Sequence, residues 1–346
     1  MEKSFVRDEI GSEFWDVPVS ETVWNGFSDN IKWFISGTSA LQFVLADAKR
    51  EREIRSAAIP SWCCECMITP FLQQGIEVFF YSVYVDEDGV LTSDYSSAPS
   101  CDLTLAISYF GYTGQRSKGT PSGVIVRDLT HEIFCFSRQD AAYYFGSLRK
   151  WAGFWTGGFA WKHSAWIAGQ EPEPLDAAYV AMRKGAMEHK LRYLSGCCED
   201  KSYLEQFEQA EDFLDRCGVM SGSPRDVDLA LHFDVATIRR KRRENAMLLL
   251  EGLREYALFQ DLAEADCPLF VPILLDQERR DGLRRFLIRN RIYCPVHWGI
   301  SDAHRLSERQ RAIYERELSI VCDQRYGKAE MTRITEMVTA YLQSHP

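Results

Sequence analysis

Hydrophobic residues in the first 130 positions of the chain follow two different spacings. Between residues 40 and 49, Leu41, Val44 and Leu45 recur at three- and four-residue intervals, which predicts a helix. Residues 64–74 have the same helical spacing. Short runs rich in aliphatic and aromatic side chains predict strands, and they occupy residues 54–59, 77–84, 103–108 and 123–126. Short apolar strands that alternate with helices favour a largely parallel sheet covered by helices.

The pattern changes after this part of the chain. Residues 171–217 are charged and helical in character, and residues 235–256 predict one long helix. The last hundred residues restart a smaller α/β pattern, with a strand at 270–275, a helix at 277–290, a strand at 292–296 and a closing helix at 328–342. We therefore predict a large domain over residues 1–250, with a charged helical insertion at about 171–217, and a small α/β domain over residues 251–346.

Composition narrows the possible functions of the chain. Its 346 residues are 46% hydrophobic, which is typical of a folded protein. Fifty acidic against 40 basic residues give a net charge of −10, which argues against a nucleic-acid-binding protein. No stretch approaches 18 consecutive apolar residues, so we expect no membrane-spanning helix and no membrane partner. The first residues lack the apolar core of a secretory signal, which indicates a cytoplasmic protein.

The 11 cysteines include two closely spaced sets, Cys63/Cys64/Cys66 and Cys197/Cys198. Neither set forms a C-x-x-C pair, and no pair of histidines has the spacing of a zinc site. We expect reduced and mostly buried thiols, and no bound metal.

The turn from Ser36 to Leu41 is the first candidate binding element. Gly37, Thr38 and Ser39 open the predicted helix, where free backbone N–H groups and the helix dipole favour a phosphate. An ordinary helix N-cap would have the same sequence.

A second candidate element follows the strand at 123–126. Asp128 stands at the end of this buried strand, and His131 follows three residues later. A carboxylate at the carboxyl end of a parallel strand faces the crevice where ligands bind, and it can hold a protonated ring nitrogen. The alternative is that Asp128 caps the next turn.

Lys150 is the third candidate, because it lies among aromatic residues and beside Arg149. Desolvation and a neighbouring cation both lower the pKa of an amine and make it a better nucleophile towards carbonyls. Gly157 and Gly158, which follow seven residues later, allow the backbone to approach a flat ligand closely. The alternative is a surface Arg-Lys pair beside a turn.

Taken in this order, the three elements resemble the pyridoxal-phosphate enzymes of aminotransferase fold type I, and more narrowly the DegT/DnrJ/EryC1/StrS group of sugar aminotransferases. The resemblance covers residues 10 to 340. The matching segments are Gly37-Thr38-Ser39-Ala40-Leu41, Pro60-Ser61-Trp62, Ser108-Tyr109-Phe110-Gly111, Asp128-Leu129-Thr130-His131, Lys150 with Gly157-Gly158, and Pro295-Val296-His297.

The resemblance implies an α/β fold of the fold type I transferases, with a mostly parallel seven-stranded sheet, and pyridoxal 5'-phosphate as cofactor. Lys150 would form the internal aldimine, and Asp128 would pair with the pyridinium nitrogen. Trp62 would stack on the ring. Further roles fall to two sets of residues: Gly37, Thr38, Ser39 and Ser147 would hold the phosphate, and His131 would lie near the phenolic oxygen or stack nearby.

The implied activity is transfer of an amino group from an amino acid to a keto-sugar, nucleotide-linked in our interpretation, by a homodimer. A sugar dehydratase or lyase of the same fold, or a binding protein that has lost catalysis, are the alternatives. Three positions depart from the pattern of the group: His131 replaces a glutamine, Ser147 precedes the lysine by three residues instead of five, and Thr156 replaces an acid.

Two other groups of residues leave alternatives open. The run Arg239–Arg243 could bind a substrate phosphate or could form a solvated face. Arg325 could reach a substrate carboxylate or phosphate, or could form a salt bridge between the domains. The aromatic residues around Lys150, which are Trp151, Trp155 and Trp161, could line the entrance of a site or belong to the core or a dimer interface.

Overall fold

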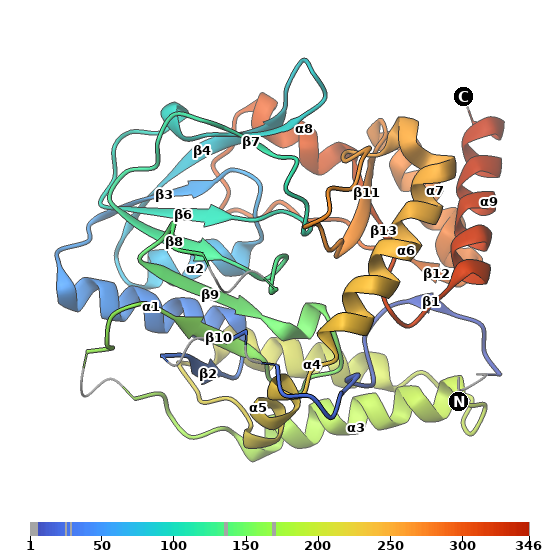
Figure 1. Ribbon diagram of the computed structural model, residues 1–346, viewed down its shortest axis with the longest axis horizontal. Helices are drawn as coiled ribbons and strands as arrows, with labels where there is room; N and C mark the ends of the chain where they lie inside the picture. Colours follow the sequence, from blue (N-terminus) through green and yellow to red (C-terminus); the bar gives the residue numbers. More distant parts are fainter. Residues whose placement is uncertain (1–5, 25, 28–29, 135–137, 168–170, 346) are drawn as a thin grey trace.

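The computed structural model describes residues 6–24, 26–27, 30–134, 138–167 and 171–345. Its centre is a nine-stranded sheet (Figure 1). In spatial order the strands are β2 (Lys32–Phe34), β10 (Gly158–Trp161), β9 (Tyr143–Ser147), β8 (Val124–Asp128), β6 (Leu103–Ile107), β3 (Ser56–Pro60), β4 (Glu77–Val85), β5 (Leu91–Asp94) and β7 (Arg116–Lys118). The five strands from β9 to β4 are parallel, and β10 runs antiparallel to both of its neighbours.

The expectation of a mostly parallel sheet is confirmed, but the expected number of seven strands is wrong. After β4 the chain turns at Asp86, whose carboxylate accepts hydrogen bonds from the N–H groups of Asp88 and Val90. It then returns as β5, antiparallel to β4, and β7 adds to this edge. A short 3₁₀ turn, Tyr95–Ser97, follows β5.

Helices and loops cover both faces of the sheet. On one face, α1 (Gly37–Glu51) and α2 (Glu65–Gln73) bury their apolar sides against the strands. The opposite face packs against α5 (Pro224–Leu231) and the start of α6 (Val235–Leu253). In β9 the alternation of a strand divides the side chains, because Tyr143 and Phe145 belong to the first core and Tyr144 to the second.

The charged segment after residue 171 is helical, as predicted, and it forms two helices. They are α3 (Ala177–Leu194), which begins at an N-cap made by Asp176, and α4 (Tyr203–Arg216). The two helices pack against each other through Tyr193, Tyr203 and Phe207, and they lie beneath the sheet in Figure 1.

The C-terminal part builds a second, smaller α/β unit. Its elements are β11 (Phe270–Leu274) paired antiparallel with β13 (Glu317–Val321), α7 (Gln277–Arg289), α8 (Glu308–Arg316), α9 (Lys328–Ser344), β12 (Ile292–Tyr293) and the end of α6 with a 3₁₀ turn, Arg254–Tyr256. Strand β1 (Ile10–Gly11) pairs with β12, and Ile10 is buried in the core of this unit. The start of the chain therefore crosses to the smaller unit, while the boundary near residue 250 stays a prediction.

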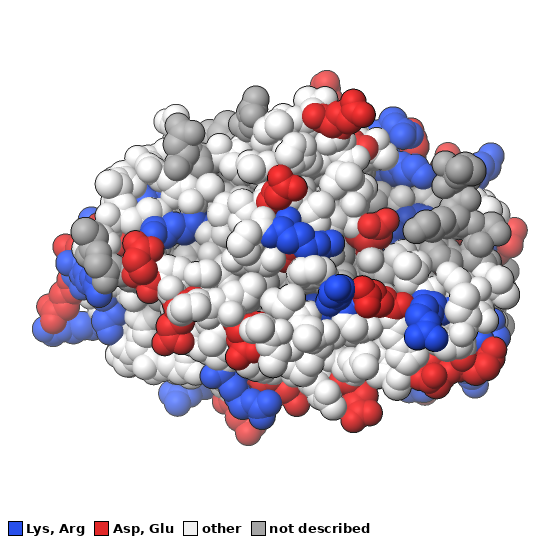
Figure 2. All heavy atoms as spheres, turned by 90° about the horizontal axis from the view of Figure 1, so that it is seen from below, with Lys and Arg blue, Asp and Glu red and all other residues white. Residues whose placement is uncertain are grey.

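Two further expectations concern the redox state of the cysteines and membrane-spanning helices. Cys64 and Cys66 form a disulfide, so the expectation of reduced thiols is wrong for this pair, whose Cα atoms lie 5.3 Å apart. Five of the other described cysteines are buried. No helix in the described part of the chain is long and apolar enough to cross a membrane. Acidic and basic side chains are intermingled on the face drawn in Figure 2.

Candidate active site

Asp128 ends β8, a strand with parallel neighbours on both sides. Its side chain is 1% exposed, and Oδ1 accepts a hydrogen bond of 2.7 Å from the Thr130 N–H. The other oxygen, Oδ2, is buried without a hydrogen-bond partner among the described residues. Burial raises the pKa of this carboxyl to about 6. A buried acceptor with no partner is costly, and such an atom is best explained by a ligand that the site is built to bind.

Lys150 follows the neighbouring strand β9, at the end of the 3₁₀ turn Leu148–Lys150. Because β8 and β9 are parallel, Asp128 and Lys150 leave the sheet at the same edge. The Lys150 side chain is exposed to a cavity but enclosed by surrounding protein. This enclosure lowers the pKa of its ammonium group; Arg149 lowers it further, while nearby carboxylates, Asp128 among them, oppose the change. A lowered pKa leaves more of the amine in its nucleophilic form.

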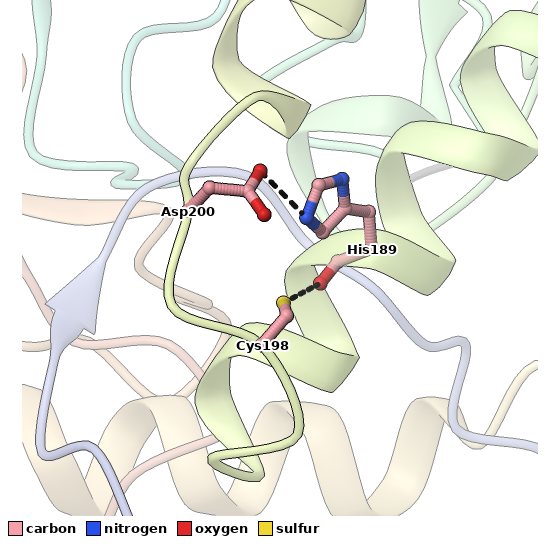
Figure 3. Close-up of side chains that lie close together, drawn as sticks. All are labelled: His189, Cys198 and Asp200. Atoms are coloured by element: carbon pink, nitrogen blue, oxygen red, sulfur yellow. Dashed lines mark hydrogen bonds and ion pairs between the residues drawn. The ribbon is translucent and has the colours of Figure 1, made fainter.

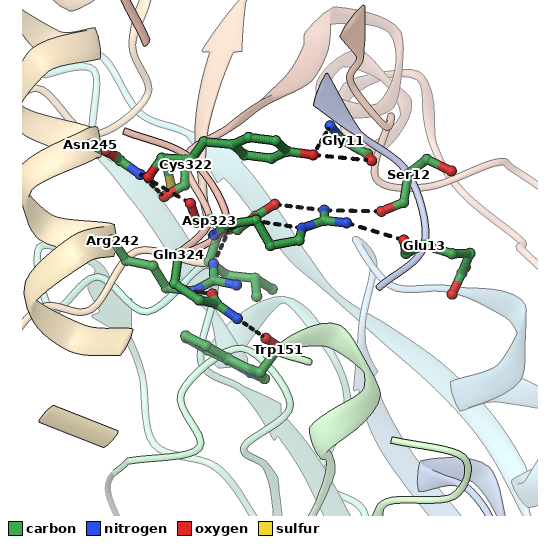
Figure 4. Close-up of polar contacts among 12 residues, drawn as sticks. Gly11, Ser12, Glu13, Trp151, Arg242, Asn245, Cys322, Asp323 and Gln324 are labelled. Carbon is green, nitrogen blue, oxygen red and sulfur yellow. Dashed lines mark hydrogen bonds and ion pairs between the residues drawn. The ribbon is translucent and has the colours of Figure 1, made fainter. Parts of the chain in front are cut away.

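Two hydrogen bonds fix the turn that carries Lys150. The indole Nε1 of Trp151 donates to the carbonyl of Thr130 at 2.7 Å, which ties this turn to the residues after Asp128. From the smaller unit, Gln324 Nε2 donates to the carbonyl of Trp151 at 2.6 Å (Figure 4). The lysine is thus held by both the large sheet and the smaller unit.

The predicted phosphate turn lies against the same edge. Gly37 is so close to the Lys150 turn that a Cβ placed on it would lie 3.3 Å from Cβ of Ser147. Gly158 passes even closer to this turn: a Cβ placed on it would lie 2.0 Å from the carbonyl oxygen of Ser36. Gly157 has a φ of +128°, in the region that favours glycine. The glycine pair is therefore required by the approach of β10 to the start of α1.

The residues of this turn differ in what they can bind. The N–H groups of Gly37 and Thr38 point out of the first turn of α1, where no helical acceptor exists. Ser39 is engaged elsewhere: its N–H donates to Ser36 Oγ, and its hydroxyl bonds to the backbone of Gly218 and Met220. These contacts leave Ser39 no donor for a phosphate and give it the task of holding the segment after α4.

Two buried histidines stand beside Asp128 and Lys150. Nδ1 of His131 accepts a hydrogen bond of 3.2 Å from the Phe110 N–H, so the proton of the neutral ring is on Nε2. The ring of His297 lies edge-on to His131, with 5.7 Å between centroids. Burial lowers the pKa of both imidazoles well below its usual value, and Lys150 lowers both further. The structure therefore brings His131 to the site as a neutral hydrogen-bond donor.

Trp62 is placed differently from the expectation. Its side chain is fully buried, stacked on Tyr109 at 4.9 Å between centroids, and its Nε1 donates to the carbonyl of His297. In this position Trp62 contacts the backbone of His297, and its faces are covered by protein.

A cavity of about 390 Å³ opens in front of Lys150. Sequence reasoning did not select most of the residues that line it. They come from the start of the chain, the start of α4 and the smaller unit, and include Glu13, Phe14, Lys201, Leu204, Arg284, Tyr293 and His297. His297 had a signal, since it belongs to the matched Pro295-Val296-His297 segment; Glu13 and Leu204 had none, because they approach Lys150 through the fold alone.

The structure gives Arg325 protein partners and buries the three tryptophans that surround Lys150 in the sequence to different extents. Arg325 pairs with Asp323 and donates to the carbonyls of Ser12 and Glu13, so it fixes the start of the chain, and it also lines the cavity in front of Lys150. Trp151 and Trp161 are buried core residues, whereas Trp155 is half-buried and its ring packs against the guanidinium of Arg225.

The basic run on α6 is divided among several partners. Arg240 pairs with Glu244 in solvent, and Arg243 bonds to the carbonyls of Ala263 and Asp266. Arg242 is fully buried, where it bonds to Gln324 and lies over the ring of Trp151. Most of the run is therefore structural. Arg242 supports the Lys150 turn and also lines the cavity, where its Nη2 is buried without a hydrogen-bond partner among the described residues.

Comparisons with known proteins identify the fold. No protein-family model and no curated protein matches the chain. Among solved structures, the apo-form of the putative sugar aminotransferase Spr1654 from Streptococcus pneumoniae is similar, with 14% identity, a TM-score of 0.63, and coverage of 91% of this chain and 86% of that one. The aminotransferase TlmJ from Streptoalloteichus hindustanus has 12% identity and a TM-score of 0.59, covering 91% and 86%. A DegT DnrJ EryC1 StrS aminotransferase from Brucella abortus has 13% identity and a TM-score of 0.55, covering 90% and 85%. The chain has the α/β fold of these aminotransferases, which is fold type I of the pyridoxal-phosphate-dependent transferases.

Proposed function

We propose that the chain is a pyridoxal-phosphate-dependent aminotransferase that acts on a keto-sugar with an amino-acid donor. The observation that carries this proposal is the unpartnered, buried Oδ2 of Asp128 at the same sheet edge as the amine of Lys150. An acid and an amine in this relation would meet the two ends of one small heteroaromatic ring.

The residues present suit the cofactor at each of its groups. Asp128 would receive the ring N–H, the amine of Lys150 would hold the aldehyde, and the N–H groups of Gly37 and Thr38 with the Ser147 hydroxyl would receive the phosphate. Nε2–H of His131 would donate to the phenolic oxygen. When bound, pyridoxal phosphate supplies an electron sink for the carbon next to the substrate nitrogen. The Lys150 amine, displaced by the donor, would then move a proton between donor and product carbons.

The same fold is found in Spr1654 in its PLP-form and PMP-form, and in DesI in the presence of its TDP-sugar product. A nucleotide-linked sugar would enter past Lys201 and Arg284, two cations on the rim of the cavity. We further propose that the protein is cytoplasmic and that it forms a homodimer. Sedimentation of the purified chain would test the dimer.

The direct test is covalent capture of the cofactor. Wild-type protein mixed with pyridoxal phosphate should become coloured, and borohydride should leave one adduct, located on Lys150 by peptide mass mapping. Lys150→Ala should stay unlabelled, whereas Lys184→Ala, which removes an exposed helix-surface amine, should behave as wild type. A chain that remains colourless, or an adduct shared among surface lysines, contradicts the proposal.

Product analysis separates transamination from the alternatives of the same fold. The loaded protein should convert glutamate to its keto acid in the absence of a sugar, because the first half of the reaction needs the donor alone. A dehydratase or a lyase would release a different product, and a binding protein without catalysis would release none.

A further inference from the structure

Three side chains of different chemistry converge away from the Lys150 cavity, at the end of α3 and in the loop that leads to α4 (Figure 3). They are His189, Cys198 and Asp200. One ligand atom of each, a ring nitrogen, the thiol sulfur and a carboxylate oxygen, lies within 4.8 Å of the other two. In Figure 3 the imidazole, the thiol and the carboxylate face a common space between the helix and the loop.

The orientation of His189 is set by a neighbour. Its Nδ1 lies 3.1 Å from the Ser202 hydroxyl, and its Nε2 lies 3.1 Å from Oδ1 of Asp200. An imidazole that binds a metal through one nitrogen usually has its other nitrogen held by a hydrogen bond in this way. Asp200 is itself oriented by the Ser202 N–H, which donates to Oδ1 at 3.1 Å.

Cys198 completes the set without a strong competing contact. Its sulfur lies 4.0 Å from the carbonyl oxygen of His189, at the outer limit for a hydrogen bond to sulfur. Its side chain is partly buried, and the thiol lies on the same side of the loop as the His189 ring.

We propose that His189, Cys198 and Asp200 bind one zinc-class divalent ion. Nitrogen, sulfur and oxygen donors together suit Zn²⁺, whereas Mg²⁺ and Ca²⁺ prefer oxygen alone. Bond lengths of roughly 2.0–2.3 Å require the three atoms to draw together by about 1 Å, which rotation of side chains in a loop allows. Because the Asp200 side chain is 64% exposed, the fourth position opens to water.

The position of this ion gives it a structural role. Lys201, which lies between the ligand Asp200 and the orienting Ser202, lines the Lys150 cavity and pairs with Glu9 at 2.7 Å. The ion would join the end of α3 to the loop that presents Lys201 and Leu204 to the rim of this cavity. It would thus stabilise one wall of the substrate cavity without contacting the cofactor.

Metal titration of the untagged, chelator-treated chain tests the proposal without reference to activity. Calorimetry with Zn²⁺ should show one ion per chain, and Co²⁺ should produce a thiolate-to-metal charge-transfer band. Cys198→Ser should abolish this band and weaken Zn²⁺ binding by at least about tenfold. Cys197→Ser removes the neighbouring exposed thiol and should change neither result. Asp200→Asn should weaken binding and retain the band.

The contrary outcomes are equally specific. If Zn²⁺ binds Cys198→Ser as tightly as wild type, or if the band disappears in Cys197→Ser instead, these residues are not the ligands. If wild type binds no ion at millimolar Zn²⁺, His189 and Asp200 form an ion pair only. Folding of each variant is verified by circular dichroism, and Cys198→Ser, the most conservative change, decides the question.

Discussion

The hydroxyl of Ser319 lies 2.8 Å from Nδ1 of His297 and also donates a hydrogen bond to Oε1 of Glu317. While Glu317 is ionised, the single hydroxyl proton goes to its carboxylate, so Nδ1 must carry its own proton and donate to Ser319. Nε2 of His297 is then a lone-pair acceptor beside Lys150. His131 has the opposite tautomer, so one donor and one acceptor face the same small space.

This relay predicts that the His297 tautomer follows the charge of Glu317. Burial raises the pKa of Glu317 to about 8, against weaker opposing effects of the hydrogen bonds from Ser319 and the His297 backbone and of the charge of Arg280. Below that pH the protonated carboxyl would donate to Ser319, whose hydroxyl would turn to Nδ1 and move the ring proton to Nε2. Imidazole ¹⁵N chemical shifts should therefore report Nδ1–H above pH 8 and Nε2–H below it.

The matched variant for this prediction is Glu317→Gln. The amide oxygen of the new side chain would accept from the backbone N–H of His297, as Oε2 of Glu317 does. Its NH₂ group would donate to the hydroxyl of Ser319. The ¹⁵N shifts should then report Nε2–H at every pH. Ser319→Ala breaks the relay and should remove the pH step. A wild-type tautomer that is the same at pH 6 and pH 9 would show that Glu317 does not control His297.

Removal of the Asp128 charge should stabilise the cofactor-free chain in a pH-dependent way. Because the folded pKa of about 6 lies above the ordinary value of 3.8, the ionised carboxylate destabilises the fold at pH above 6, and this penalty disappears as the pH falls below 4. Asp128→Asn retains the oxygen that accepts from Thr130. It should raise the free energy of unfolding by up to about 3 kcal/mol at pH 8, since two pKa units correspond to that energy.

Urea denaturation at pH 8 and pH 5 measures this difference, and the gain should be smaller at pH 5. The same variant should bind pyridoxal phosphate more weakly than wild type, because its amide cannot pair with a charged ring nitrogen. A variant that is less stable at both pH values would indicate that Oδ2 has a partner within the protein.

Sequence patterns predicted the parts of the fold that depend on local spacing. Helices α1, α6 and α7 carry regular apolar stripes, and β3, β4 and β6 are short apolar runs; all six appear within a few residues of the predicted bounds. The residue pattern predicted β3, β4, β6 and β8 of the nine strands, and the count of seven came from the resemblance. Strands β5 and β7 were missed because they are polar and their pairing depends on a turn, and β2 and β9 were missed as well. Strand β10 was missed because its glycine and aromatic residues were interpreted as a ligand-binding element.

The site was predictable where its chemistry is contiguous in sequence. Asp128, His131 and Lys150 stand in motifs that carry their own chemical signal, and the fold brings them together. The role of Ser39 depends on its hydrogen bonds to residues 218–220, and the role of Trp62 depends on its hydrogen bond to His297. Both sets of partners are distant in sequence. No local pattern contains that information, and the same holds for Gln324 and for the cavity wall formed by α4.

Loss of Gln324 should loosen the turn of Lys150. Its amide donates to the Trp151 carbonyl and accepts from Nε of the buried Arg242, so Gln324→Ala leaves two buried polar groups without partners. We expect a loss of about 1–3 kcal/mol in the free energy of unfolding. Gln324→Glu would retain the bond to Arg242 alone and should be intermediate. Thermal unfolding of the three proteins gives the order, and equal stability of Gln324→Ala and wild type would contradict this role.

The contact between Gly158 and Ser36 predicts a purely steric effect of one added methyl group. Gly158→Ala would place Cβ 2.0 Å from the Ser36 carbonyl oxygen, so β10 and the start of α1 must separate. Overpacking of this kind costs about 1–3 kcal/mol in the free energy of unfolding. Because the N–H groups of Gly37 and Thr38 move with Ser36, binding of pyridoxal phosphate should weaken more than binding of pyridoxal, which lacks the phosphate.

Gly185→Ala is the control for this variant. Gly185 lies in α3 with no atom within 4 Å of the new Cβ, and the higher helix propensity of alanine should stabilise the chain by up to about 1 kcal/mol. If Gly158→Ala weakens both ligands equally, the phosphate is not held at the start of α1.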